Sequence, residues 1–137
     1  MYGTDRYNLN RFVWAQDRPV RTGFGQYHSE YEIALAELRA GKKRGHWIWF
    51  VIPRLTGTSS MSQYYGLGNR WAARAYLKHP VLGPRLLRCV EAILAARGTL
   101  LEVFGDVDAA KVRQTAELFA SLNVASSHLF LKLLCKV

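Results

Sequence analysis

Apolar residues recur every three or four positions along most of the chain, and this spacing is typical of amphipathic helices. A first helix is predicted over residues 8–17, with one side formed by Leu9, Phe12, Val13 and Gln16. Residues 17–28 then contain one proline and two glycines, which predict an irregular loop that is unusually long for its position.

The second predicted helix has the clearest boundaries. Ser29 and Glu32 form a capping box at its start, in which each side chain bonds the backbone N–H of the other residue. Gly41 and the cations after it suit the end of the helix, because positive charge is favourable beside the last carbonyl groups. The expected buried side consists of Tyr31, Ala34, Leu35 and Leu38.

Residues 47–52 are apolar on both sides rather than on one. Trp47, Trp49 and Val51 would oppose Ile48, Phe50 and Ile52 in an extended segment. A segment without a polar side is expected to be buried on both sides, as a short strand or as a central helical turn. Pro53 is expected to end it.

The second half of the chain predicts further helices separated by recognisable boundaries. We expect one or two turns near Gln63, a helix over 70–79 capped by Asn69, and a helix that begins near Leu82 and ends at Gly98. Thr99 and Glu102 form a second capping box, which opens a short turn that ends at Gly105. The remaining apolar positions predict a helix that contains Val112, Ala116 and Phe119, then a last helix that contains Leu129, Phe130, Leu133, Leu134 and Val137. The expected fold is therefore a single all-α domain over residues 1–137, and the missing stop after the last helix indicates truncation there.

Composition narrows the class of protein. Half of the residues are apolar and two cysteines lie far apart in sequence, so we expect a packed core and no disulfide framework. The beginning of the chain is polar and the longest apolar run is far shorter than the roughly 20 residues of a membrane span. We therefore expect a cytoplasmic protein without a membrane partner.

Charge points to an anionic partner. The net charge is +9, and residues 38–90 contain ten Lys or Arg and no Asp or Glu. These cations either pair with acids from other segments or form a positive pocket for phosphate or carboxylate groups. A nucleic acid is a possible partner on charge alone, although no known nucleic-acid-binding motif is present.

Candidate ligand-binding residues lie within the apolar segment 47–52 and before and after it in sequence. Small and hydroxylated residues near Gln63 leave backbone N–H groups free for an anion, and the arginines after them suit a phosphate. Trp47 and Trp49 are either core residues or stacking surfaces for a base, and His46 is either structural or an acid–base group. The full candidate set is His46, Trp47, Trp49, Gln63, Tyr64, Tyr65, Arg70, Arg74 and Lys78.

Several stretches resemble one uncharacterised family. "YEIALAELRAGKKRGHWIWFVIPRLTG", "SMSQYYGL" and "ARAYLKHPVLGPRLLRCVEAIL" occur in the order found in the family catalogued as domain of unknown function 1810 (DUF1810). The resemblance implies a compact, mostly helical domain and supplies no catalytic residues. Some members are labelled calpastatin, but such inhibitors are long polar segments, whereas this chain is patterned for a core.

A fainter resemblance suggests an enzyme. "SQYYGL" followed by "YLKHPVLGPRLL" is similar to segments of the NADAR superfamily, which implies action on ADP-ribose-type N-glycosides. The sequence thus leaves three hypotheses: a binding domain for a phosphorylated or nucleotide-like ligand, an N-glycoside hydrolase, and a nucleic-acid-associated protein. We expect neither a cofactor nor a metal site, because the four histidines are scattered without ligand spacing.

Overall fold

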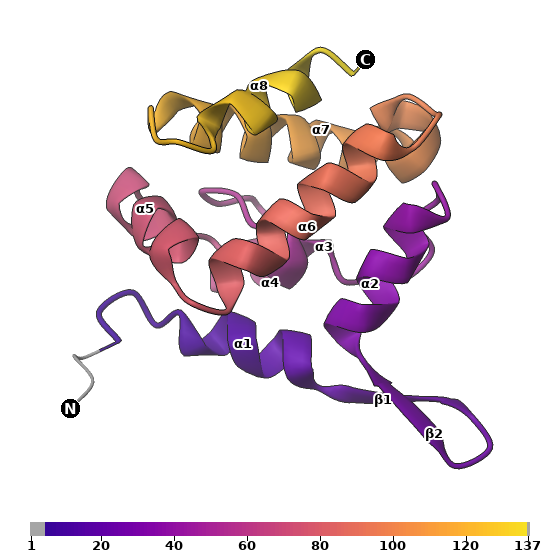
Figure 1. The fold of residues 1–137 in the computed structure, drawn as a ribbon. Coiled ribbons are helices and arrows are strands. Elements are labelled where there is room, and N and C mark those ends of the chain that lie inside the picture. The colour runs from indigo at the N-terminus through magenta and orange to yellow at the C-terminus, as the bar shows by residue number, and fades with distance from the viewer. Residues whose placement is uncertain (1–4, 137) are drawn as a thin grey trace.

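A computed structural model describes residues 5–136 and shows a mostly helical domain with a small antiparallel sheet. Figure 1 shows α6 running diagonally across the molecule, with α7 and α8 on one side of it and α1 on the other. The elements are α1 (Asn10–Asp17), β1 (Pro19–Gly23), β2 (Gln26–Ser29), α2 (Glu30–Arg39), α3 (Ile48–Val51), α4 (Ser60–Tyr64), α5 (Arg70–Lys78), α6 (Leu82–Ala95), α7 (Leu100–Ser121) and α8 (Ser127–Leu134).

The predicted loop over residues 17–28 is wrong, and with it the purely all-α class. β1 and β2 form an antiparallel hairpin that extends from the body of the domain (Figure 1). The turn uses Gly25 at a φ of 65°, a conformation that glycine adopts without strain. Because nearly all strand side chains are exposed, the hairpin has no alternation of apolar and polar residues from which strands could be predicted.

The predicted helix boundaries are confirmed where local capping determines them. Both capping boxes are present, at the starts of α2 and α7, and the Asn69 side chain accepts a hydrogen bond at the start of α5. Gly105, at a φ of 80° and a ψ of 170°, divides α7 into a short first piece and a longer second piece. This division matches the short turn and separate helix that the sequence predicts. Val137 lies outside the described residues.

The two-sided apolar segment is a single buried helical turn. Trp47, Ile48, Phe50, Val51 and Ile52 are buried, and their neighbour in the middle of α3 is half-buried. The prediction of central burial is confirmed, with the helical turn in place of the strand.

Gln16 fixes α1 against this centre. Its fully buried side-chain amide donates to the Phe50 carbonyl oxygen at 2.7 Å and to the Tyr76 hydroxyl at 3.2 Å. Phe12 and Ala15 are also fully buried, so these three residues define the inner side of α1. Trp14, which precedes Ala15 in sequence, is consequently turned outward.

Candidate functional site

The arginines of α5 contact the end of α7 rather than an open cleft. Arg70 Nη2 donates to the Ser121 carbonyl oxygen at 3.2 Å, and Arg74 Nη2 donates to the Leu122 carbonyl oxygen at 3.1 Å. These carbonyls close a helix, where positive charge is favourable. Lys78, the third predicted site residue on this helix, is exposed at the end of α5.

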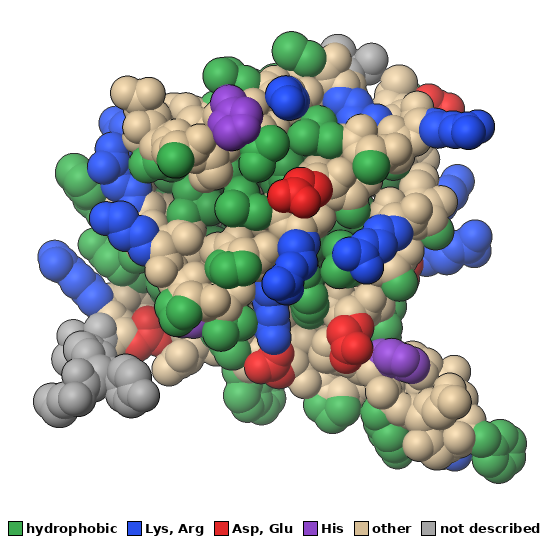
Figure 2. Space-filling view, in the orientation of Figure 1, with side chains coloured by type: hydrophobic (Ala, Val, Ile, Leu, Met, Phe, Trp, Pro, Cys, Tyr) green, Lys and Arg blue, Asp and Glu red, His purple; other side chains and the backbone are tan. Residues whose placement is uncertain are grey.

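The other cations of residues 38–90 are distributed over the fold. Lys43 pairs with Asp108 at 2.8 Å, and Arg85 pairs with Asp17 at 2.7 Å. Figure 2 shows Lys and Arg side chains across one whole face of the molecule, with acidic side chains among them. The structure therefore does not gather the mid-chain cations into a single pocket.

Trp47 is held in a closed corner of the core. It is fully buried, and its indole N–H donates to Glu37 Oε1 at 2.9 Å. The same oxygen accepts the backbone N–H groups of Arg44 at 2.7 Å and Gly45 at 2.8 Å. Burial opposes the charge of Glu37, but these three hydrogen bonds outweigh it and lower the pKa of the carboxyl. His46 is exposed beside this corner.

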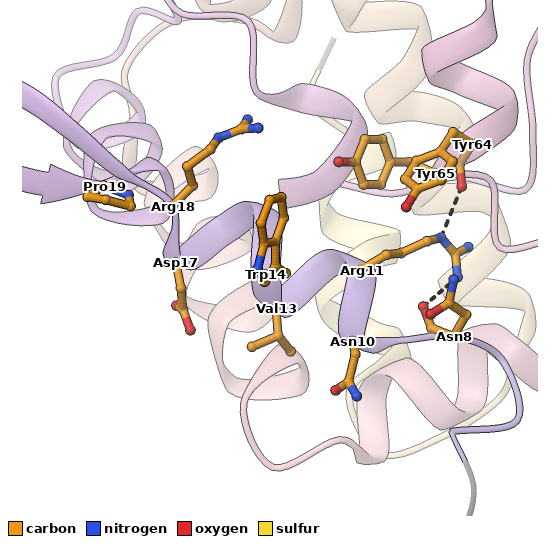
Figure 3. A pocket seen from close by; sticks show the side chains of 10 residues that line it. All are labelled: Asn8, Asn10, Arg11, Val13, Trp14, Asp17, Arg18, Pro19, Tyr64 and Tyr65. Carbon is orange, nitrogen blue, oxygen red and sulfur yellow. Dashed lines mark hydrogen bonds between the residues drawn. The ribbon is translucent and has the colours of Figure 1, made fainter.

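An open groove lies between α1 and α4 and brings two of the predicted residues together. Tyr64 and Tyr65, at the end of α4, face Trp14 of α1 across it (Figure 3). The groove has a volume of about 710 Å³ and is lined by Asn8, Asn10, Arg11, Val13, Trp14, Asp17, Arg18, Pro19, Tyr64 and Tyr65.

The aromatic side chains of the groove differ in exposure. Trp14 is 74% exposed and Tyr64 is 59% exposed, whereas Tyr65 is only 9% exposed. The Tyr64 and Tyr65 rings meet edge to face at a centroid distance of 4.8 Å. Burial raises the pKa of the Tyr65 phenol above its ordinary value of 10.0. The groove thus combines two exposed aromatic surfaces with one fixed ring beneath them.

Arg11 fixes the two walls relative to each other. Its guanidinium donates to the carbonyl oxygens of Tyr7 and Asn8 on the α1 side, both at 2.6 Å. It also donates to the carbonyl oxygens of Tyr64 at 3.0 Å and Gly66 at 2.8 Å, at the end of α4. Because these bonds occupy the guanidinium, Arg11 holds the groove open instead of offering its charge to a ligand.

Arg18 and Asp17 supply the charges at the other end of the groove. The Arg18 side chain is 46% exposed, and its one acidic contact among the described residues is Glu30 at 3.7 Å. Figure 3 shows Arg18 and Trp14 projecting on the same side of α1. Asp17 carries the opposite charge and forms an ion pair with Arg85. Arg18 is therefore the groove cation with the greatest freedom to bind an anion.

The remaining predicted site residues lie outside this groove. Gln63 is exposed on α4, and its amide makes a long contact of 3.5 Å to the Thr58 carbonyl oxygen. Trp49 is half-buried, with the Lys111 ammonium 5.1 Å from its ring centroid. The prediction from sequence missed Trp14 and Arg18. A signal was present, because Trp14 falls on the side of the first helix opposite Phe12 and Gln16.

Comparisons with known proteins identify the family. A model of the family described as "Protein of unknown function (DUF1810)" matches residues 6–137. The chain is similar to the conserved hypothetical protein Rv1873 from Mycobacterium tuberculosis, whose crystal structure it matches with a TM-score of 0.84 and 38% sequence identity. That match covers 96% of this chain and 88% of the mycobacterial chain. No curated protein matches. No helix within residues 5–136 is long and apolar enough to cross a bilayer. With nearly its whole length matched, the chain belongs to the DUF1810 family.

Proposed function

We propose that the groove between α1 and α4 binds a small phosphorylated or nucleotide-like ligand. The observation that carries this proposal is the exposure of Trp14 and Tyr64 toward one open groove beside Arg18. The proposal keeps the ligand class expected from the sequence, keeps Tyr64 and Tyr65, and adds Trp14 and Arg18 in place of the α5 cations. The α5 cations, including Arg70 and Arg74, stay outside the groove lining.

Aromatic stacking supports a planar ligand. A large indole exposed to 74% gains from a partner that covers it, and stacking of a base on an aromatic side chain contributes roughly 1–3 kcal/mol. Trp14 and Tyr64 belong to different elements, so a planar group between them can contact both walls. The groove volume of about 710 Å³ lies in the range of small-molecule sites, on the order of 300–1,000 Å³.

The polar lining supports a phosphate on that ligand. The Arg18 guanidinium can form two parallel hydrogen bonds to a phosphate, and such bonds are stronger than those to neutral acceptors. Its contact with Glu30, at 3.7 Å between side chains that retain solvent access, is weak enough to be exchanged. Asn8 and Asn10 add amide groups that can bond the sugar or the base edge.

The test is a titration with adenosine monophosphate by isothermal calorimetry, repeated with adenosine. We expect AMP to bind more tightly than adenosine, Trp14→Ala to weaken both by at least tenfold, and Arg18→Gln to weaken AMP alone. Trp71→Ala is the matched control, because Trp71 is 61% exposed and lies outside the groove. Equal losses in Trp14→Ala and Trp71→Ala, or no binding of either compound by the wild type at millimolar concentration, would overturn the proposal.

Two further variants distinguish a phosphate bound in the groove from one bound by the cations of α5. If the α5 cations bind it, Arg70→Gln and Lys78→Gln weaken AMP binding and Arg18→Gln does not. The groove proposal predicts the reverse.

Hydrolysis of an N-glycoside is the second candidate function, because one carboxylate lines the groove. Asp17 is 51% exposed at its side chain and is held at 2.7 Å by Arg85. A carboxylate in this position could stabilise positive charge that develops on the ribose carbon while the bond to the base breaks, water adds to that carbon to form the new C–O bond, and the base leaves with a proton from the water. The test is release of nicotinamide or free base from NAD or ADP-ribose derivatives, followed by chromatography. Turnover that Asp17→Asn abolishes while AMP still binds would favour this activity, and the absence of turnover leaves the binding function alone.

A further inference from the structure

A second, much smaller hollow lies between α3, α4 and α7. Its polar lining consists of Trp49, Arg54, Ser62, Tyr65 and Lys111, and two isoleucines of the α3 region complete it. The space open to the centre of a water-sized sphere is about 10 Å³, so the hollow takes a single particle of that size or slightly larger. Tyr65 also lines the larger groove, but the hollow has its own set of charged groups.

The lining is rich in hydrogen-bond donors. The Trp49 indole N–H is buried and has no acceptor among the described residues. Ser62 Oγ, in a residue only 4% exposed, accepts hydrogen bonds from Arg54 Nη2 at 3.0 Å and from the Ser59 hydroxyl at 2.9 Å. Both lone pairs of Ser62 Oγ are therefore used, and its own proton remains available to donate.

Two cations supply the charge of the hollow. Arg54 donates one hydrogen bond to Gln114 Oε1 and another to Ser62 Oγ, and neither acceptor is charged. The Lys111 ammonium, in a side chain 16% exposed, lies 3.3 Å from Asp108. Asp108 is the neighbouring acid, and it is shared with Lys43 at 2.8 Å. Asp108 is thus shared between two lysines, and Arg54 has no acidic partner among the described residues.

Acceptors are scarce in the same lining. A water molecule in this position could accept from the indole and the cations, but it would need acceptors for its own two protons. The lining contains no carboxylate, the Ser62 oxygen is already occupied, and the Tyr65 phenol oxygen is the one further acceptor among the lining side chains, which is one fewer than a water needs. An anion needs only donors. From this imbalance we propose that the hollow binds one small anion of halide size, held by the Trp49 N–H, the Ser62 hydroxyl, Arg54 and Lys111.

The first test measures the melting temperature during a titration with sodium bromide, with ionic strength held constant by sodium methanesulfonate. An anion that binds only the folded state should raise Tm by about 5 °C at ten times its dissociation constant, and the rise should saturate. We expect Trp49→Phe and Lys111→Gln to abolish the saturable rise. Lys132→Gln, an exposed lysine of α8, is the matched control and should retain it.

The second test does not depend on the folding of any variant. Crystals of the wild-type chain soaked in bromide should show an anomalous peak within hydrogen-bond distance of the Trp49 indole nitrogen. Density for a water at that position together with no saturable Tm response would overturn the proposal. A rise with inorganic phosphate that equals the bromide rise and is lost in Trp49→Phe would contradict the one-atom size. The proposal is independent of AMP binding in the larger groove, so either can fail without the other.

Discussion

Trp47 and Trp14 show how differently one residue type is used in two regions of this domain. Trp47 is fully buried and its N–H is bound to Glu37, whereas Trp14 is 74% exposed over an open groove. The first opens a run of apolar residues that extends to Pro53, and the second lies on the polar side of an amphipathic helix. A cluster of aromatic residues in the sequence thus indicates the core. A single aromatic residue on the polar side of an amphipathic helix indicates the candidate site.

The largest effect is expected from truncation of the buried indole. Trp47→Ala should lower the free energy of unfolding by about 4 kcal/mol, because it opens a large cavity and leaves the Glu37 carboxylate without one of its donors. Urea denaturation followed by circular dichroism measures the loss. A loss below about 1 kcal/mol would mean that Trp47 is not a central core residue.

Removal of the Glu37 side chain should be the next most damaging change. Glu37→Ala leaves one indole and two backbone N–H groups without their acceptor, and we expect a loss of about 3 kcal/mol. Glu37→Gln keeps an acceptor oxygen and should lose about 1 kcal/mol. Equal losses in the two variants would show that the charge, and not the hydrogen-bond geometry, stabilises this corner.

The same corner should make stability depend on acidic pH. The pKa of Glu37 is lowered in the folded state, despite burial, by its three hydrogen bonds. Its contribution is therefore present above the unfolded-state pKa of about 4.5 and is lost as pH falls through the lower folded-state value. Asp108, whose pKa Lys43 and Lys111 lower against the effect of burial, adds to the same trend. Glu37→Gln should reduce the fall in stability between about pH 5 and pH 3, measured by urea titrations at each pH, and an unchanged slope would exclude Glu37 as a source.

The smallest effect on stability is expected in the groove. Trp14→Ala should change the free energy of unfolding by no more than about 0.5 kcal/mol, because the indole is largely in water already. Trp71→Ala, also exposed, should behave alike in denaturation while differing in AMP binding. A loss above about 1.5 kcal/mol in Trp14→Ala would mean that the indole supports the fold and would weaken its assignment to a ligand.

Many helix boundaries could be predicted from the sequence because short local motifs determine where those helices begin and end. The capping boxes at Ser29 and Thr99 and the break at Gly105 depend on residues within a few positions of each other. The hairpin could not be predicted in this way, because its strands have no buried side and therefore show no alternation of apolar and polar residues.

The candidate site was harder to predict because it depends on pairing between distant elements. Tyr64 and Tyr65 were expected from the polar segment near Gln63, but Trp14 joins them only when Arg11 connects α1 to the end of α4. The mid-chain cations were predicted to form a ligand site, but the structure uses several of them elsewhere. Their excess is real in sequence, yet Arg70 and Arg74 contact helix-terminal carbonyls that no local pattern identifies.

The indole N–H resonances of the four tryptophans give the most direct test of the groove. In a ¹H–¹⁵N correlation spectrum recorded during AMP titration, we expect the Trp14 indole signal to shift progressively and saturate. The Trp47 and Trp71 signals should stay in place, because one lies in the core and the other lies outside the groove. A spectrum in which Trp14 does not move, or in which Trp71 moves equally, would contradict ligand binding at this site.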